Sequence, residues 1–292
     1  MEHDPPLLTV AIPTYNSAHF LPDTLMSVFK QCIDDIEIVL VDNGSTDNTA
    51  EVVQAFLGPK IRYHRNEMNV GSRVNHNISL SLARGKYIKW VHADDVLIEG
   101  LFEKQLEVLE KHPNVSLVTC DMQVTDEHLN PTSVSRLFPG HHPGRKVINV
   151  CLSGCRNLIG GPTNFMFRRS FAEGLELSPD YHFVSDLRFG LLLLLRGDYV
   201  NINQIGYYYR RHAGTDTVLS CPTDLQKQEY QQLITEFKWW NPLNLYYANR
   251  YGIARNRDVL RMHGSLPLGP ARLVDAVTAA IALMHQKFAI RR

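Results

Sequence analysis

The chain has 292 residues, of which 44% are hydrophobic and 21% are charged, a composition typical of a soluble globular protein with one sizeable core. Lys and Arg together number 30, as do Asp and Glu, so no excess charge favours an anionic membrane, and a nucleic-acid partner is not expected. No apolar run approaches the roughly 20 residues that cross a bilayer, and residues 1–6 lack the features of a signal peptide. The five cysteines form no C-x-x-C pair, so we expect reduced thiols and a cytoplasmic protein.

Hydrophobic strands and amphipathic helices alternate along the first hundred residues. Apolar runs predict strands over 7–12, 36–41, 61–64 and 87–91, and helical spacing predicts helices over 20–29, 50–56 and 71–83. Four such alternations are the signature of an α/β fold, with a mostly parallel, Rossmann-like sheet that is flanked by helices.

The rest of the chain has a less regular pattern. Helices are predicted over 101–109 and 187–195, and strands over 115–120, 164–167 and 199–209. Residues 130–144 contain several Pro and Gly residues and the adjacent His141 and His142, so we expect a loop that covers the functional site. Beyond His212 the pattern is helical, and the last amphipathic helix is predicted over 271–290.

Acidic side chains follow two of the predicted strands. Asp42 closes the second strand, and Asp94 and Asp95 follow the fourth. Ligands of parallel α/β sheets bind outside the carboxyl ends of the strands, so these acids and residues 13–15 are expected on one rim. Adjacent carboxylates commonly share an oxygen-ligand cation such as Mg²⁺ or Mn²⁺, which in turn holds a phosphate. The two clusters therefore predict a site for a nucleotide diphosphate.

The order of the motifs resembles that of a known family. The motifs are VAIPTYN (10–16), VDNGSTDNT (41–49), ARGKYI (83–88), HADD (92–95), LRGDY (195–199) and YRRH (209–212). Over roughly residues 7–212 the chain resembles family 2 glycosyltransferases of the GT-A fold, especially bacterial enzymes that build surface polysaccharides. The resemblance implies a catalytic domain over 1–212 that binds a nucleotide sugar, followed by a helical extension over 213–292.

The resemblance implies a base pocket at the ends of the first two strands. Pro13 and Tyr15 would form its edge, with the tyrosine ring close to the base, and Asn16 belongs to the same nucleotide-binding motif. Asp42 would accept the imide N–H of a uracil or thymine, so a UDP-sugar is the favoured donor and a dTDP-sugar the next. The alternative for Asp42 is a turn acid that caps the next helix, but Asp47 suits that role better.

The resemblance also implies a metal and diphosphate site at the end of the fourth strand. Asp94 would contact the ribose or the metal's water shell, and Asp95 would bind Mn²⁺ or Mg²⁺ directly. His92 stands where the family motif often has an acid, and we expect it to orient the site. Arg73 would bind the diphosphate, because its donor fork matches phosphate oxygens; a solvated helix residue is the alternative.

Two further motifs would complete the reaction site. Cleavage of a sugar–phosphate bond leaves charge on the diphosphate that a cation neutralises, while the acceptor hydroxyl needs a general base. Asp186 matches the family's base position and implies an inverting single displacement; a helix N-cap is the alternative. Arg210 and His212 resemble a late loop that closes over the diphosphate and the metal, with an exposed basic turn as the alternative.

Other classes of protein stay open to different degrees. A nicotinamide-binding enzyme would need G-x-G-x-x-G after the first strand, which residues 13–16 lack. A nucleotidyltransferase and a catalytically silent sugar-nucleotide-binding module are the remaining alternatives.

We expect a saccharide or a lipid-linked saccharide as acceptor. The helix over 271–290 would pack on the catalytic domain, pair two subunits as a homodimer, or lie on the inner face of the membrane.

Overall fold

The computed structural model describes residues 4–215 and 223–237. The chain divides into two compact units: the first comprises Met1–Cys151 and Asn157–Glu229, and the second comprises Leu152–Arg156 and Tyr230–Arg292. All of the predicted site residues belong to the first unit. The predicted division of the chain at 212/213 stays a prediction.

Ten strands form one mixed sheet within the described part of the chain. Their order is β3-β2-β1-β4-β9-β6-β10-β5, with β7 paired to β6 and β8 paired to β10. The strands are β1 (Leu8–Thr14), β2 (Ile36–Asp42), β3 (Ile61–Arg65), β4 (Tyr87–Trp90), β5 (Val96–Leu97), β6 (Val115–Thr125), β7 (Pro131–Ser135), β8 (Gly140–His142), β9 (Met166–Arg168) and β10 (Asp198–Arg210). β1 to β4 pair in parallel, and β9 runs antiparallel to its neighbours β4 and β6.

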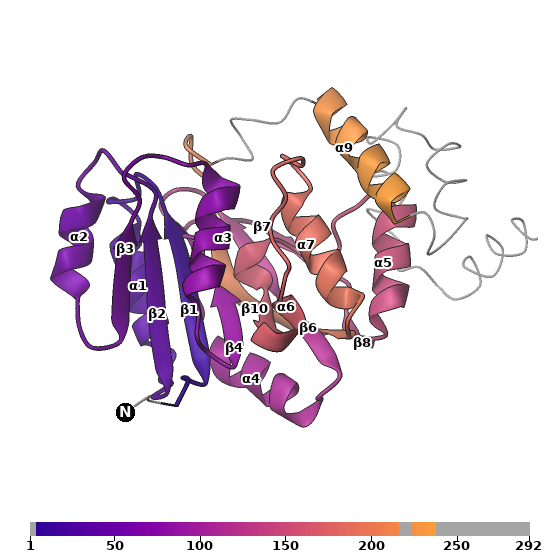
Figure 1. Cartoon of the computed structure of the whole chain (residues 1–292), viewed down its shortest axis with the longest axis horizontal. Coiled ribbons are helices and arrows are strands. Elements are labelled where there is room, and N and C mark those ends of the chain that lie inside the picture. The colour runs from indigo at the N-terminus through magenta and orange to yellow at the C-terminus, as the bar shows by residue number, and fades with distance from the viewer. Residues whose placement is uncertain (1–3, 216–222, 238–292) are drawn as a thin grey trace, which may run out of the picture. The chain divides into compact units, whose positions relative to one another are not determined.

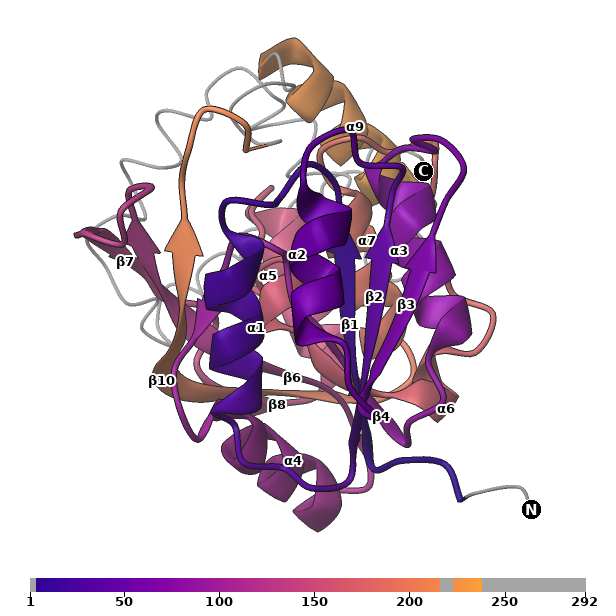
Figure 2. The ribbon, with the colours of Figure 1, turned by 90° about the vertical axis from the view of Figure 1, so that its left-hand side faces the viewer.

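Helices cover both faces of the parallel strands (Figure 1). They are α1 (Leu21–Phe29), α2 (Thr49–Phe56), α3 (Ser72–Leu82), α4 (Leu101–Lys111), α5 (Gly144–Ser153), α6 (Arg169–Ala172), α7 (Ser185–Leu194) and α9 (Thr223–Glu236), with the short 3-10 turn η1 (Pro162–Asn164). Right-handed crossovers from β1 to β2 and from β2 to β3 move in one direction along the sheet, whereas the crossover to β4 moves back. α1 and α2 therefore lie on one face of β1–β3 and α3 on the other, as Figure 2 shows. The predicted α/β sheet flanked by helices is confirmed.

The parallel register brings the carboxyl ends of the first strands to one edge (Figure 2). Thr14 of β1 pairs with Asp42 of β2, which in turn pairs with Arg65 of β3. β1 pairs with β4 as far as Ala11 and Trp90, so the residues that follow β4 emerge at the same edge. This register therefore places the carboxyl ends of β1, β2 and β4 at one edge of the sheet, as predicted from the sequence.

The core explains why the central strands are continuous apolar runs. Every residue of β1 and β4 is buried, because the sheet is covered on both faces. Glu37 of β2 is a polar exception whose carboxylate accepts the hydroxyl of Thr9 at 2.7 Å and pairs with Arg62 at 3.0 Å and Arg84 at 2.7 Å. Burial by itself raises the pKa of Glu37, yet these bonds hold that pKa below its ordinary value. The buried charge is thus compensated by its partners.

The expectation of a loop over 130–144 is wrong. β7 pairs with β6, and β8 pairs with the start of β10, so this stretch adds two strands to the sheet. β7 is exposed over most of its length, which removes the apolar alternation by which a strand is recognised. His141 and His142 lie in β8, where His141 Nε2 is 3.2 Å from Asp198 Oδ2. β5 and α6 are likewise absent from the sequence prediction, because they have only 2 and 4 residues.

The described part of the second unit comprises Leu152–Arg156 and the end of α9. Four apolar side chains there are buried at helical spacing: Tyr230, Leu233, Ile234 and Phe237. Among the residues that the structure describes, no helix is both long and apolar enough to cross a membrane. The helix predicted over 271–290 lies outside the described residues.

Candidate active site

The loops that follow β1 and β2 are bonded to each other at the rim. Asn16 has a φ of 47°, in the left-handed region that asparagine tolerates better than most residues. Its Oδ1 accepts the N–H of Thr46 at 2.8 Å, and its own N–H donates to Ser45 Oγ at 2.9 Å. Beside it Tyr15 is 43% exposed, whereas Pro13 is buried in β1. These hydrogen bonds between the two loops therefore account for the presence of Asn16. Contact of Pro13, Tyr15 and Asn16 with a base stays a prediction.

Asp42 is fully buried at the carboxyl end of β2. Its Oδ1 accepts the N–H of Ser45 at 2.9 Å, and its Oδ2 accepts the hydroxyl of Tyr63 at 2.8 Å, with Arg65 Nε at 3.6 Å. Burial and the bond to Asp42 raise the pKa of Tyr63 to about 12, so the phenol remains a donor. These bonds fix the turn after β2. Because a carboxylate has about four acceptor sites, Asp42 can accept a further bond, and the bond from a base stays a prediction.

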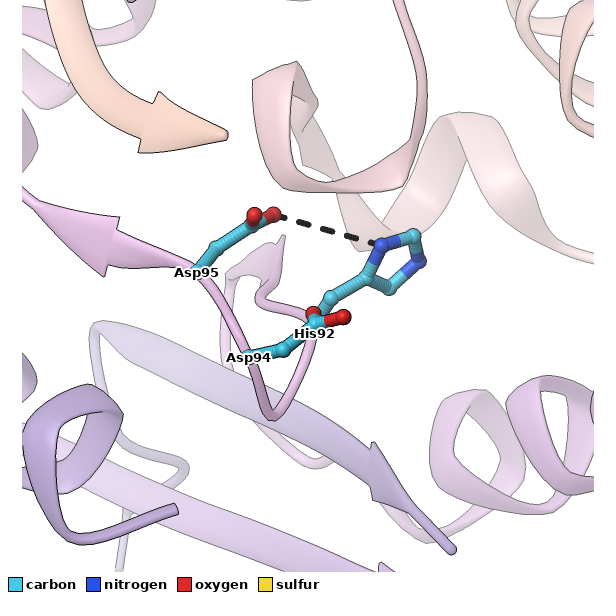
Figure 3. A group of neighbouring side chains, drawn as sticks. All are labelled: His92, Asp94 and Asp95. Atoms are coloured by element: carbon cyan, nitrogen blue, oxygen red, sulfur yellow. Dashed lines mark ion pairs between the residues drawn. The ribbon is translucent and has the colours of Figure 1, made fainter. Parts of the chain in front are cut away.

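Three side chains that follow β4 form a cluster able to hold a cation (Figure 3). His92, Asp94 and Asp95 each offer one ligand atom, and these atoms lie within 4.8 Å of one another. Asp95 is fully buried, and within residues 4–215 and 223–237 its Oδ2 has no hydrogen-bond partner. Burial and the neighbouring Asp94 raise the pKa of Asp95 well above its ordinary value. A buried carboxylate oxygen without a partner is costly, so the cluster fits Mn²⁺ or Mg²⁺.

A second histidine orients His92. His76 Nδ1 lies 2.8 Å from the carbonyl oxygen of Ser72 and therefore donates its proton there, while His76 Nε2 lies 3.3 Å from His92 Nε2. Because His76 Nε2 accepts, the network assigns the proton of His92 to its Nε2 and the lone pair to its Nδ1. That nitrogen faces Asp95 Oδ2 at 4.0 Å (Figure 3). The geometry fits direct metal binding by His92, beyond the orienting role expected from the sequence.

His212 contacts the other carboxylate of the cluster. Its Nε2 lies 3.1 Å from Asp94 Oδ2, and the N–H of Gly214 donates to its Nδ1 at 3.2 Å. Because Nδ1 accepts, Nε2 carries the proton and donates to Asp94. Burial alone raises the pKa of Asp94, but the bond from His212 and the nearby imidazoles bring that pKa below its ordinary value. His212 thus belongs to the site, and metal binding by His212 stays a prediction.

The guanidinium of Arg210 is buried rather than exposed. Its side chain is 4% exposed, its Nη2 pairs with Asp23 of α1 at 2.8 Å, and its Nη1 donates to the carbonyl of Glu127 at 3.2 Å. The guanidinium also lies over the ring of Phe20, 4.7 Å from the centroid. Its backbone N–H, at 3.3 Å, faces Asp95 Oδ1. Arg210 therefore joins the end of β10 to α1, and its contact with a diphosphate stays a prediction.

Side chains of α3 bind the loop that precedes α7. Arg73 Nη1 lies 3.0 Å from His182 Nδ1. Asn77 makes two bonds with Leu177: its amide nitrogen donates to the carbonyl at 2.9 Å, and its oxygen accepts the N–H at 2.8 Å. Arg73 is only partly buried, so its guanidinium remains a candidate for the diphosphate.

Asp186 lies in the first turn of α7 and is half-buried. The N-cap of α7 is Val184, so Asp186 is not the cap residue. Its Oδ1 accepts the N–H of Leu187 at 2.7 Å, and a Cβ at Gly161 would lie 3.3 Å from its Oδ2. Burial raises the pKa of Asp186 to about 6 despite its bond with the backbone. A carboxyl group with this pKa is well matched to accept a proton near neutral pH.

The turn η1 and the glycine before it lie next to the acidic cluster and next to Asp186. Thr163 Oγ1 accepts the N–H of His92 at 3.0 Å, while Gly161 lies against Asp186. The buried Lys89 donates to the carbonyl of Thr163 at 2.6 Å, and burial lowers the pKa of Lys89 to about 8. This turn was not predicted from the sequence. Its signal was a run of two glycines and a proline, which marks a turn but no function.

The fold and the site together define a class of protein. Acidic side chains at the carboxyl ends of parallel strands are suited to hold a nucleotide diphosphate through a cation, and Asp186 is suited to accept a proton. This combination fits a glycosyltransferase that uses a nucleotide sugar. The family model described as glycosyl transferase family 2 matches residues 9–175. The chain belongs to glycosyltransferase family 2.

Two sequence relatives extend this result. An uncharacterized protein of Mycobacterium tuberculosis is 30% identical over 240 residues, which cover 79% of this chain and 75% of the relative. The glycosyltransferase GlyG of Streptococcus pneumoniae is 27% identical over 225 residues, which cover 72% of each chain.

Solved structures confirm the GT-A fold. The 1-349 fragment of S. aureus TarS in complex with UDP-GlcNAc gives a TM-score of 0.70 at 17% identity, over 89% of this chain and 76% of that one. Aligned with the same fragment without a named ligand, the chain spans 65% of that chain, slightly less than two thirds. The mannosyltransferase PcManGT of Pyrobaculum calidifontis, in complex with GDP-Man and Mn²⁺, gives 0.60 at 19% identity, over 96% of this chain and 81% of that one.

Proposed function

We propose that this chain transfers a sugar, with inversion, from a nucleotide-diphosphate sugar to a hydroxyl acceptor and that it uses a divalent cation. The observation that carries the proposal is the buried Oδ2 of Asp95, which lacks a hydrogen-bond partner in the described part of the chain and lies beside Asp94 and His92. A related structure holds GDP-Man and Mn²⁺ and another holds UDP-GlcNAc, which supports a nucleotide sugar as donor.

The donor base is proposed to be uracil, with thymine next. Asp42 would accept the imide N–H, and Pro13, Tyr15 and Asn16 would border the base. Tyr15 supports this arrangement because its ring is partly exposed beside the end of β1. The two nucleotide-bound neighbours carry a uridine and a guanosine donor, so the preference for uracil rests on Asp42 and on the family resemblance.

The cation is proposed to lie between the acidic cluster and the diphosphate. Asp95 would bind it together with Nδ1 of His92, and His212 would be a further nitrogen ligand if its Nε2 gave up the proton that it now donates to Asp94. Asp94 would be directed to the ribose or to the metal's water shell. Bound Mn²⁺ or Mg²⁺ would neutralise the charge that develops on the leaving diphosphate. Arg73 and Arg210 are the proposed basic contacts to the phosphates.

Asp186 is proposed as the general base. The acceptor's hydroxyl oxygen forms a bond to the anomeric carbon as the bond from that carbon to the diphosphate oxygen breaks. The electron pair of the broken bond remains on the nucleotide diphosphate, and the hydroxyl proton passes to the carboxylate of Asp186. A single displacement of this kind inverts the anomeric configuration. The raised pKa of Asp186 supports this role.

The acceptor is proposed to be a saccharide or a lipid-linked saccharide of surface polysaccharide or glycoconjugate synthesis in the cytoplasm. Likeness to GlyG, a glycosyltransferase of Streptococcus pneumoniae, supports a bacterial sugar-transfer reaction. The hydroxyl acceptor follows from the proposed base, because a carboxylate is needed where the nucleophile must lose a proton.

Calorimetric titration of UDP, dTDP and GDP, each with Mn²⁺ and with a chelator, tests the proposal. Wild type is compared with Asp95→Ala and with Asp34→Ala, an exposed acid before β2 that serves as the matched control. We expect one diphosphate to bind only with Mn²⁺, and its binding to be lost in Asp95→Ala alone. Binding that ignores both metal and Asp95 would overturn the metal site. UDP release from a panel of UDP-sugars then separates an enzyme from a silent binding module.

A further inference from the structure

A carboxylate from α9 holds the loop that precedes α7. Glu229 is 4% exposed, and its Oε1 accepts the N–H of His182 at 2.6 Å. Its Oε2 accepts the N–H groups of Phe183 at 2.6 Å and Val184 at 3.0 Å. Three consecutive N–H groups that converge on one carboxylate form a backbone site for an anion. Val184 is the N-cap of α7, so the negative charge also lies where the helix dipole favours it.

The same loop is attached to α3 on the other side. Leu177 is bonded twice to Asn77, and His182 lies 3.0 Å from Arg73. The loop thus runs between a helix that borders the proposed diphosphate site and the carboxylate of Glu229. Val184 carries the last of the amides bound to Glu229, and Asp186 follows it by two residues. The position of the backbone at 182–184 therefore sets the position of the Asp186 side chain.

We propose that Glu229 is a positioning residue for the transfer reaction, because it fixes the backbone at 182–184 and thereby places Asp186 beside the acceptor hydroxyl. This inference rests on the proposed role of Asp186 as the base. Glu229 acts through Asp186 and touches neither donor nor acceptor. Displacement of a reacting group by about 1 Å can lower turnover by about 100-fold. The segment after β10, which the sequence assigned to an extension, would therefore contribute to the reaction site.

The decisive variant is Glu229→Gln, which keeps the size of the side chain but replaces one accepting oxygen with an NH₂ donor. Gln228→Ala, an exposed neighbour on α9, is the matched control. Three quantities are measured on the full chain: kcat for UDP release from the active UDP-sugar, the Kd of UDP with Mn²⁺, and amide hydrogen exchange over 177–188. We expect Glu229→Gln to lower kcat by 10- to 100-fold, to leave the Kd within about twofold, and to speed exchange at 182–184. Gln228→Ala should match wild type in all three.

Further outcomes separate this inference from the proposed function. Wild-type kcat in Glu229→Gln, with Asp186→Asn inactive, would overturn the positioning role and leave the proposed base in place. Full activity in Asp186→Asn would instead overturn the base itself. A fall in kcat matched by an equal loss of UDP-binding sites would mean that the variant had unfolded, and would overturn a specific role. Glu229→Asp, which keeps the charge on a shorter side chain, should recover part of the lost kcat.

Discussion

Asp186 carries the pKa shift with the clearest consequence for turnover. Burial raises the pKa of Asp186 to about 6, and a general base must be deprotonated to act. We therefore expect kcat to fall about tenfold per pH unit below pH 6 and to level off above it. Asp186→Asn should lower kcat by about 10²- to 10⁴-fold and remove this acid limb. A kcat profile between pH 4.5 and 8 on both proteins checks this, and a midpoint near pH 4 would contradict it.

The same residue should lower stability at neutral pH. The folded-state pKa of Asp186, about 6, exceeds the ordinary 3.8, so the folded state binds this proton more tightly than the unfolded state. The free energy of unfolding should therefore fall as pH rises from 3.8 to about 6. Asp186→Asn should raise it by at most about 3 kcal/mol at pH 7.5 and change it little near pH 4. Denaturant unfolding at both pH values measures the difference, which must depend on pH if burial is the cause.

The histidine pair at the acidic cluster predicts an effect on metal affinity. His76 orients the ring of His92 through the contact of 3.3 Å between their Nε2 atoms. Loss of a residue that orients a metal ligand typically weakens metal binding by about 10- to 100-fold. His76→Ala and His92→Ala should both weaken Mn²⁺ binding by that amount in calorimetry, whereas His64→Ala, exposed on β3, should not. If all three variants bound Mn²⁺ as tightly as wild type does, His92 would have only a structural role.

At the scale of elements, the turn at η1 predicts a change in kcat without a change in donor binding. Gly161 has a φ of −102°, which alanine adopts without strain, but the new Cβ would lie 3.3 Å from Asp186 Oδ2. Gly161→Ala should displace the carboxylate by a few tenths of an ångström and lower kcat by up to about tenfold. Gly58→Ala is the control, since a Cβ there meets nothing within 4 Å. Measurement of kcat, together with calorimetric titration of UDP, tests this prediction. A change in UDP affinity without a change in kcat would show that Gly161→Ala does not act through Asp186.

The elements themselves differ in how far sequence predicts them. β1 to β4 and α1 to α3 were predictable because each buries an apolar run or stripe against the sheet. Asp47, expected to cap the next helix, accepts the N–H of Thr49 at 3.0 Å, but the N-cap of α2 is Asn48, so that expectation is off by one residue. β7 escaped prediction because it is exposed and contains a proline, a residue tolerated at sheet edges. Local pattern therefore predicts elements that bury a face and misses those held mainly by backbone pairing.

At the scale of the whole molecule, ligand binding should stabilise the fold. A ligand that binds only the folded state adds about 2.7 kcal/mol to the free energy of unfolding at 100 times its Kd. UDP with Mn²⁺ at that concentration should therefore raise the melting temperature by several degrees, and a chelator should abolish the increase. Asp95→Ala should show no increase under either condition. Thermal scans with and without ligand test this, and stabilisation that survives the chelator would argue against a metal-linked site.

The site was predictable only in part, for a reason that concerns the whole chain. Asp42, Asp94 and Asp95 meet at one rim because parallel topology brings the strand ends together, a rule that a sequence can supply. The partner of Arg210 could not be predicted, because Asp23 is 187 residues away in the chain. The same holds for Glu229 and the amides of 182–184. Such pairs arise from tertiary packing, which no local spacing encodes.

The turn at η1 also has a consequence for protein engineering. The candidate metal cluster comes from the chain before residue 96 and the proposed base from the chain after 184, while Thr163 bonds to His92 and Gly161 lies next to Asp186. A chimera that joined the first half of this chain to the second half of a relative would set this chain's acidic cluster against the turn and the proposed base of the relative. Exchange of acceptor preference between relatives should therefore succeed more often when the 160–164 segment, the acidic cluster at 92–95 and Asp186 all come from the same protein.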